Sequence, residues 1–147
     1  MEPLLWEIGE TATALRRAFD RRAASLGVTR AQWRALARIS RQPGLRQVEL
    51  AEQLDIEAIT LCRIIDRLEE SGLVERQRDP ADRRAWQLLL TDKAKPITEH
   101  LGALADEFGD EVLTGLSTAD RKSLRARLAS IRANIASGDP RKKASNG

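Results

Sequence analysis

Four arginines surround a short turn sequence in the middle of the chain. Asp79-Pro80-Ala81-Asp82 has the composition of a tight turn, because proline fixes one backbone dihedral and aspartate caps locally. Arg76 and Arg78 precede this turn, and Arg83 and Arg84 are at its end. Arginine at the tip of a hairpin suits the narrow, electronegative minor groove of DNA. A charged edge strand that avoids unwanted sheet pairing would carry the same residues, and the pattern alone favours that alternative.

Residues that could support catalysis or metal binding are scarce. The chain has one cysteine, Cys62, and one histidine, His100, which together make no plausible zinc site. There is no glycine-rich phosphate loop and no serine or cysteine in a recognisable nucleophile context. The sequence therefore predicts a protein that is not an enzyme and has neither a cofactor nor a metal.

The composition is typical of a helix-rich globular domain. The 147 residues suit one domain, and the 41% hydrophobic content is too high for a disordered chain. A net charge of +3 and a pI near 9.5 favour an anionic partner without establishing one. The single cysteine, the acidic N-terminus and the lack of a long apolar run lead us to expect a cytoplasmic protein.

Two short helical patterns precede the arginines. Residues 48–54 form the first and residues 59–71 form the second, with only Asp55-Ile56-Glu57 between them. Such a pair predicts a helix-turn-helix, in which Asp55 can adopt the left-handed backbone conformation that the turn needs. The period then changes to two over residues 73–78 and 85–90, which predicts a two-stranded hairpin.

A helix-turn-helix makes DNA binding the leading hypothesis. The N-terminal residues of its second helix would reach base edges in the major groove. They are Glu57, Ala58, Thr60, Leu61 and Arg63, whereas Ile59, Ile64 and Leu68 are assigned to the core. Arg63 would bind a guanine or a phosphate; alternatively, it is an exposed arginine paired with Asp66. Because the arginine hairpin follows a helix-turn-helix, DNA binding becomes the favoured interpretation of the hairpin over a charged edge strand. Asp82 would then fix the direction of a neighbouring arginine through a charge-assisted hydrogen bond.

Long amphipathic helices are predicted at both ends of the chain. Apolar stripes mark residues 3–25, 97–112 and 124–135. Thr29 and Gln32 form a predicted capping box, and Thr91-Asp92 is predicted to supply a capping oxygen to another helix. The terminal stripes favour a twofold dimer over an intramolecular bundle.

The order of these parts resembles the MarR family of bacterial transcription regulators, especially its SlyA-like branch. The resemblance runs from about Leu4 to Ile135, and its most specific piece, from Leu50 to Ile97, is LAEQLDIEAITLCRIIDRLEESGLVERQRDPADRRAWQLLLTDKAKPI. It implies a mainly α (α+β) winged-helix homodimer that binds a pseudo-palindromic operator. The implied organisation is a single domain, 1–137, with a DNA-binding lobe at about 30–92, dimerisation helices at about 3–25 and 93–136, and a disordered basic tail, 138–147.

The resemblance also assigns roles to individual residues. Asp82 is similar to the family's structural wing aspartate, and Arg84 is similar to its minor-groove arginine. Arg46, Asp55 and Cys62 depart from the family pattern, which has a small capping residue, glycine, and Thr, Ser or Val at these positions.

Family members often bind small aromatic or phenolic anions, which implies a repressor relieved by such a ligand. Arg16, Arg17 and Trp33 are the expected pocket residues, although Trp33 as a packing residue and the arginines as solvated groups are the favoured alternative. Cys62 is not expected to be a redox sensor. The alternative function is a winged-helix module that binds a ligand or a protein and no longer binds DNA.

Overall fold

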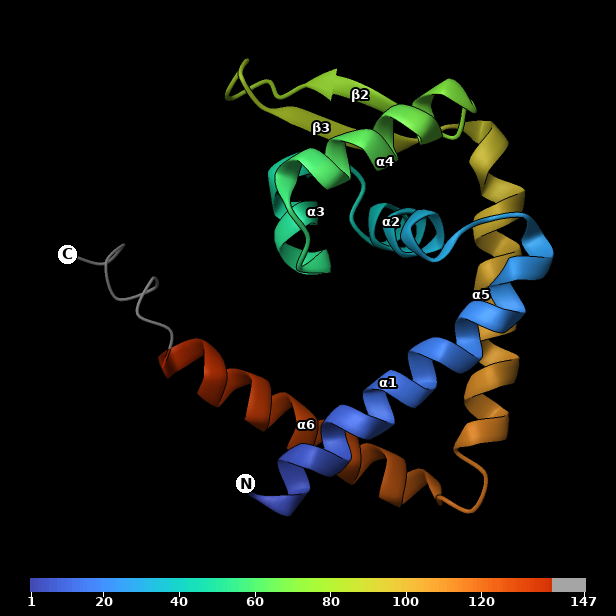
Figure 1. Ribbon diagram of the computed structural model, residues 1–147, viewed down its shortest axis with the longest axis vertical. Helices are drawn as coiled ribbons and strands as arrows, with labels where there is room; N and C mark the ends of the chain where they lie inside the picture. The colour runs from blue at the N-terminus through green and yellow to red at the C-terminus, as the bar shows by residue number, and fades with distance from the viewer. Residues whose placement is uncertain (139–147) are drawn as a thin grey trace. The chain divides into compact units, whose positions relative to one another are not determined.

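A computed structural model describes residues 1–138, so all but the first residue of the predicted tail lies outside the described residues (Figure 1). Residues Met1–Phe108 form one compact unit, and a second unit begins at Gly109. The fold is mainly helical with a small sheet, which confirms the predicted fold class. In chain order the elements are α1 (Pro3–Ala23), η1 (Ala24–Leu26), α2 (Arg30–Arg41), β1 (Leu45–Arg46), α3 (Gln47–Leu54), α4 (Ala58–Glu70), β2 (Val74–Arg78), β3 (Trp86–Leu90), η2 (Asp92–Ala94), α5 (Lys95–Val112) and α6 (Thr118–Gly138).

Helices α3 and α4 form the predicted helix-turn-helix. Asp55 ends α3 in the left-handed conformation, with φ of 53°, so an aspartate does tolerate the position where glycine is common. Gly72, with φ of 73°, follows α4 and lets the chain turn directly into β2. Both ends of α4 are therefore set by local backbone chemistry.

The sheet has three antiparallel strands in the order β1-β3-β2, where the sequence predicted two. Strands β2 and β3 pair from Val74 with Leu90 to Arg78 with Trp86. The additional strand, β1, is two residues long and pairs Leu45 with Leu88. A two-residue strand is too short to show alternation, which explains why the sequence pattern missed it.

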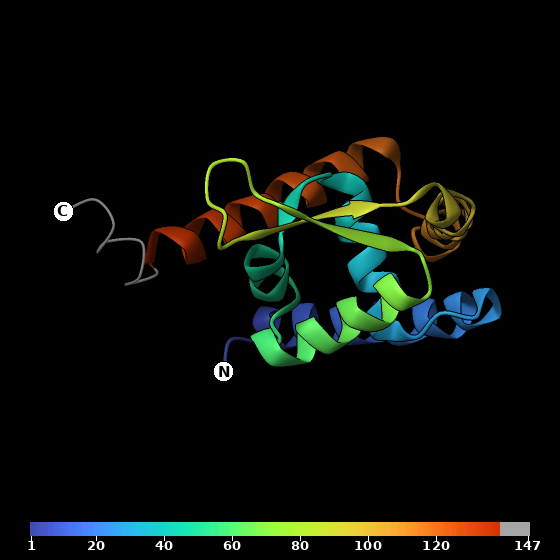
Figure 2. The same cartoon turned by 90° about the horizontal axis from the view of Figure 1, so that it is seen from above.

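One continuous core holds this lobe together. Leu36 and Ile39 of α2 pack with apolar residues of α3, α4 and the sheet, all of which are buried. Helix α4 and the β2–β3 hairpin lie on one side of α2, and α1 lies on the other (Figure 1). Seen from above, the hairpin loop and the N-terminal end of α4 are at the same end of the lobe (Figure 2).

A second, smaller core joins α1, α2 and the first part of α5. Phe19 makes an edge contact with Trp33 at 4.8 Å between ring centroids and a tilted contact with Phe108 at 5.7 Å. Trp33 Nε1 donates to Asp20 Oδ1 at 2.8 Å, which satisfies the indole N–H. Trp33 is thus a packing residue, as the favoured alternative predicted.

One of the two helix starts singled out by the sequence is capped as expected. Thr29 and Gln32 form the full capping box of α2, and Ser117 and Asp120 exchange the equivalent hydrogen bonds at α6. The prediction for Thr91 is wrong, because its hydroxyl donates to the carbonyl of Gly72 at 2.5 Å and caps no helix. Thr91 instead joins the end of β3 to the end of α4.

Candidate nucleic-acid interface

The N-terminal part of α4 presents four of the five predicted contact residues to solvent. Glu57, Ala58, Thr60 and Arg63 are all exposed. Glu57 occupies the N-cap position, but its side chain accepts no hydrogen bond from the helix. Arg63 makes no hydrogen bond or ion pair within residues 1–138, and its alternative partner Asp66 is instead bound by Arg76 at 2.7 Å. Thr60 and Arg63 are therefore available to a partner.

The fifth residue, Leu61, was wrongly predicted to reach DNA. Its side chain is completely buried and packs in the lobe core with Ile65 and Leu68. The neighbouring Ile59 was wrongly assigned to the core, since 67% of it is exposed. The two residues lie about 200° apart around the helix. An error in the predicted position of the apolar stripe therefore exchanges their expected environments.

Arg76 is another prediction that the structure contradicts. Its side chain is only 12% exposed and binds Asp66 at 2.7 Å and Glu69 at 3.1 Å, both on α4. It also donates to Gln47 Oε1 at 3.0 Å and to the carbonyl oxygen of Cys62 at 3.3 Å. Burial opposes the charge, but the two carboxylates outweigh it and raise the pKa of Arg76. Arg76 therefore fastens β2 to α4 and is not free for DNA.

Arg78 is held within the hairpin. Its guanidinium carbon lies 4.0 Å from the ring centroid of Trp86, on the opposite strand, in a cation–π contact. Its Nη1 donates to the carbonyl oxygen of Arg83 at 2.7 Å. Arg78 thus links β2, β3 and the loop between them, and the role of Trp86 in this link was not predicted.

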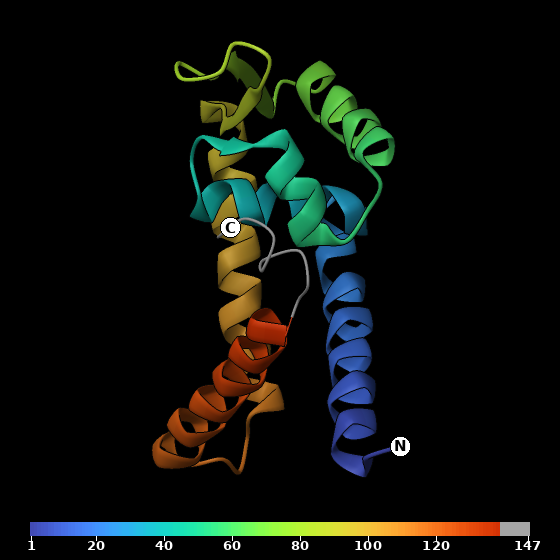
Figure 3. The ribbon, with the colours of Figure 1, turned by 90° about the vertical axis from the view of Figure 1, so that its left-hand side faces the viewer.

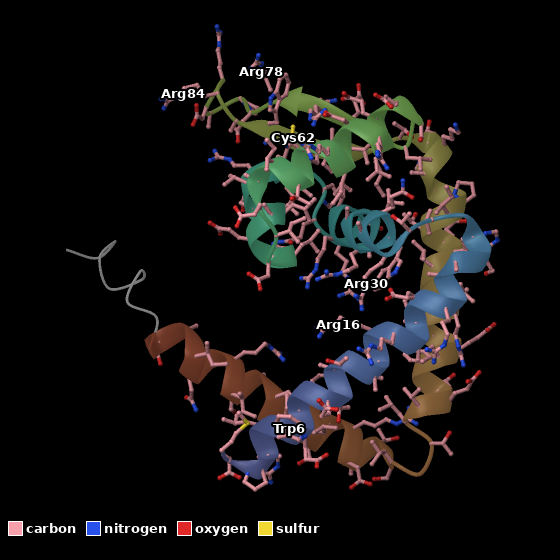
Figure 4. The ribbon with its side chains drawn as sticks, in the orientation of Figure 1. Trp6, Arg16, Arg30, Cys62, Arg78 and Arg84 are labelled. Carbon is pink, nitrogen blue, oxygen red and sulfur yellow. The ribbon has the colours of Figure 1, made fainter. Side chains whose placement is uncertain are left out.

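Arg83 and Arg84 are the exposed arginines at the loop. The side chain of Arg84 is 93% exposed, and Figure 4 shows it directed away from the lobe. Asp82 Oδ1 accepts from the backbone N–H of Arg84 at 3.1 Å and lies 3.4 Å from its Nε. This local contact is the one predicted for Asp82, and its effect on DNA binding stays a prediction.

A different aspartate, Asp79, is the buried anchor of the loop. Its Oδ1 accepts from the backbone N–H groups of Ala81 at 2.7 Å and Asp82 at 3.3 Å, and its Oδ2 accepts from Arg46 Nε at 2.7 Å. The bond from Ala81 is the main cause that lowers the pKa of Asp79, against the opposing effect of burial. Arg46, which departs from the family pattern, thereby ties the start of α3 to the hairpin. The two residues are 33 positions apart, so no local signal predicted the pair.

A groove of about 510 Å³ lies between the hairpin and the starts of α3 and α4. Arg84 and Asp82 line one side, and Val48 and Ala58 line the other. Val48 is exposed and was not among the predicted site residues. Figure 3 shows the hairpin and α4 together at one end of this unit, with α2 and α3 below them in this view. The groove therefore lies between Arg84 on the hairpin loop and Ala58 at the start of α4, and the exposed Arg63 lies farther along that helix.

Other chemistry is limited in the part of the chain that the structure describes. No group of histidine, cysteine or acidic residues there could hold a metal ion. Cys62 is partly buried, with its Sγ 3.8 Å from Arg76 Nη2. Among these same residues, no helix combines the length and apolarity that a membrane span requires.

An apolar pocket of about 380 Å³ lies between α1, α2 and α5. Phe19, Trp33, Leu101 and Phe108 form much of its wall, and Arg16 lies at its edge. The predicted pocket residue Arg17 does not line it, because one residue on a helix turns the side chain by about 100°. Arg17 is instead exposed to solvent.

Comparison with known proteins decides the family. The model of the MarR family matches residues 28–86. The transcriptional regulator PA3341 is 33% identical in sequence, with a TM-score of 0.84, over 91% of this chain and 98% of that chain. The transcriptional regulator SlyA is 30% identical, with a TM-score of 0.78, over 91% of this chain and 94% of the other. The chain belongs to the MarR family.

A MarR regulator solved with DNA is also similar to this chain. It is a putative MarR family regulator from Listeria monocytogenes, complexed with a 26mer DNA. It is 26% identical, with a TM-score of 0.82, over 93% of this chain and 91% of that one. The similar MarR proteins are transcriptional regulators and not enzymes, which agrees with the prediction from the sequence. Placement in the SlyA-like branch of the MarR family stays a prediction.

Proposed function

We propose that this MarR protein is a homodimeric, sequence-specific DNA-binding repressor that a small aromatic anion releases from a pseudo-palindromic operator. The observation that carries the DNA-binding part is the open groove between the exposed Arg84 on the hairpin loop and Ala58 at the start of α4, the helix on which Arg63 is also exposed. Binding to the chromosome would also require the protein to be in the cytoplasm.

The proposed contacts divide between the two grooves of DNA. The start of α4 would enter the major groove with Glu57, Ala58, Thr60 and Arg63 near base edges or phosphates. The hairpin would then be the wing, with Arg84 in the minor groove and Asp82 beside it as a brace. The similar MarR family regulator from Listeria monocytogenes, which was solved in complex with DNA, supports this proposal by similarity.

Exposed apolar side chains support the homodimer. In α1, Leu4, Leu5 and Trp6 are large, apolar and exposed, and Figure 4 labels Trp6 near the start of this helix. In α6, no residue is buried, although Leu124 and Ile135 are apolar. Amphipathic helices normally bury such stripes, and a second copy would do so here. We therefore keep the division into a lobe at about 30–92 and dimerisation helices at about 3–25 and 93–136 within one domain, 1–137.

The apolar pocket supports the ligand. Its aromatic walls suit a ring, and Arg16 at its edge could bind a carboxylate. A ligand there would weaken DNA binding if it favoured a spacing of the two α4 helices that differs from the operator spacing. Benzoate and hydroxybenzoate are suitable probes, and a change in tryptophan fluorescence that is absent from Trp33→Phe is the binding signal, since Trp6 and Trp86 also fluoresce.

Selection of bound duplexes from a random pool tests the DNA-binding proposal. We expect the recovered sequences to share a pseudo-palindrome, and Arg84→Ala to weaken binding to it. If Arg84 neutralises a phosphate, the slope of log K against log salt should fall by about one. Arg21→Ala removes the same charge from an exposed position on α1 and is the matched control.

Two outcomes would reject the proposal. Recovered duplexes without a common sequence would favour the alternative module that binds no specific DNA. An affinity and salt slope unchanged in Arg84→Ala would show that the hairpin does not act as a wing. Sedimentation across a range of protein concentrations tests the dimer independently, since a monomer throughout would contradict it.

A further inference from the structure

Four arginines of α1 and α2 lie close enough together that Arg34 is repelled by Arg16, Arg30 and Arg38. Arg30, Arg34 and Arg38 follow one another at four-residue spacing, so they share one face of α2 and span about 12 Å of it. Arg16 projects from α1 toward the same space as Arg30 (Figure 4). We call these four residues the arginine cluster.

The cluster has little negative charge near it. Asp20 binds Arg30 Nε at 2.7 Å and also accepts from Trp33 Nε1 at 2.8 Å. Four guanidinium groups and this one carboxylate leave a formal charge of +3, which is four minus one. Because both oxygens of Asp20 already have partners, it cannot neutralise the rest of the cluster.

The remaining guanidinium groups are poorly paired. Arg34 is partly buried and donates only to the carbonyl oxygen of Leu54, at 3.5 Å. Within residues 1–138, Arg16 and Arg38 make no hydrogen bond or ion pair. Burial and then repulsion from Arg16, Arg30 and Arg38 lower the pKa of Arg34. The charges of the neighbouring arginines thus disfavour the charged form of Arg34.

We propose that the arginine cluster binds a small oxyanion with at least two negative charges, such as a phosphate ester or a polycarboxylate. Guanidinium groups bind such oxygens in pairs through two parallel hydrogen bonds. Arg34 and Arg38, farther along α2 than the Asp20 pair, supply the main contacts, and Arg16 closes the site from α1. A singly charged anion would neutralise only one of the three excess positive charges of the cluster, so a multiply charged anion fits better than a monocarboxylate.

Neither of the surfaces described above accounts for this cluster. Helix α4 and the hairpin lie across α2 from α1, so DNA bound to them does not reach these arginines (Figure 1). The apolar pocket shares only Arg16 with the cluster, and Arg30, Arg34 and Arg38 do not line it. The site is therefore separate from the proposed interface with DNA and from most of the pocket.

Calorimetric titration of the full chain, without DNA, tests the proposal. Inorganic pyrophosphate and citrate are the probes, acetate is the singly charged comparison, and sodium chloride keeps the ionic strength constant. Arg16→Gln and Arg38→Gln are suitable variants because neither side chain holds the fold together. Arg21→Gln is the control, because it makes the same change in charge at an exposed position of α1.

We expect saturable binding of pyrophosphate or citrate and much weaker binding of acetate. Arg16→Gln and Arg38→Gln should each weaken the tighter probe at least about tenfold, whereas Arg21→Gln should not. The melting temperature should rise with anion in the parent and less in Arg38→Gln. Without anion, Arg38→Gln should melt no lower than the parent, because the substitution removes repulsion.

Three results would overturn the proposal. The first is no saturable binding of either probe. The second is an equal loss in Arg21→Gln, which would show general charge screening. The third is that the parent binds no anion and that the subunits of Arg16→Gln dissociate. That result would mean that the arginine cluster pairs with carboxylates of a second copy of the chain. All readouts are made without DNA, so they are independent of the operator selection.

Discussion

Substitution of Arg76 by alanine should destabilise the protein, because this side chain connects β2 to α3 and α4. It binds the carboxylates of Asp66 and Glu69, and it donates to Gln47 and to the carbonyl oxygen of Cys62. The sequence presented the same arginine as a DNA contact. A stability measurement therefore separates the two roles directly.

The size of the effect follows from the exposure of its partners. Asp66 and Glu69 are 51% and 45% exposed, so water can solvate them again and each pair contributes about 0.5 kcal/mol. The two hydrogen bonds to neutral acceptors contribute about 0.5–1.5 kcal/mol each. These contributions sum to about 2–4 kcal/mol, and the packed aliphatic stem adds to the expected loss. Arg76→Lys keeps the charge but not the planar fork, and it should lose about 1 kcal/mol.

Urea unfolding at one fixed protein concentration measures this loss. With a slope of about 2 kcal/mol per molar urea, Arg76→Ala should lower the midpoint by about 1–2 M. Arg84→Ala is the matched control, since its 93% exposed side chain contacts only Asp82. That control should change the free energy of unfolding by less than about 0.5 kcal/mol.

The reasoning fails if Arg76→Ala unfolds at the same urea concentration as the parent but binds DNA more weakly. That result would mean that the contacts of Arg76 contribute nothing to stability and that its guanidinium is available to phosphate. Loss of stability in Arg84→Ala to the same extent would also refute it, because the two arginines would then be equivalent.

Three further predictions concern caps, core and acid stability. Thr29→Ala removes half of the α2 capping box and should cost about 1 kcal/mol in urea unfolding. Leu61→Ala leaves a cavity and should cost about 2–5 kcal/mol, whereas Ile59→Ala should stay within about 0.5 kcal/mol; equal losses would reject the assignment of Leu61 to the core. The pKa of Asp79 is lower in the folded protein than in the unfolded chain, so this carboxylate stabilises the fold at pH values above its unfolded pKa. That stabilisation is lost as the pH falls through the folded pKa. Unfolding from about pH 5 to pH 2 should therefore depend less on pH in Asp79→Asn, and an unchanged profile would exclude this carboxylate.

Local chemistry allowed much of the fold to be predicted. The left-handed turn at Asp55 and the capping box at Thr29 and Gln32 depend on residues within a few positions of each other. The two long strands were visible from their alternation. Strand β1 was not, because Leu45 is strand-like only through its pairing with Leu88, 43 residues later by number.

The site was harder to predict because its contacts are long-range. Asp79 was recognised only as a turn residue, yet its partner Arg46 lies 33 positions earlier. Asp82, two residues before Arg84, was within reach of motif reasoning and does contact it. Burial also depends on helix rotation, so Leu61 and Ile59 exchanged places although both lie in a correctly predicted helix.

The arginines around the turn show why residue type alone does not specify a binding role. Arg76 is enclosed by carboxylates of α4, and Arg78 stacks on Trp86 while binding the loop carbonyl of Arg83. Both restrict the freedom of the hairpin before any partner arrives. A loop that is already ordered loses less conformational entropy on binding. Arg76 would then assist DNA binding by holding β2 against α4, whereas the exposed Arg78 stays a predicted DNA contact.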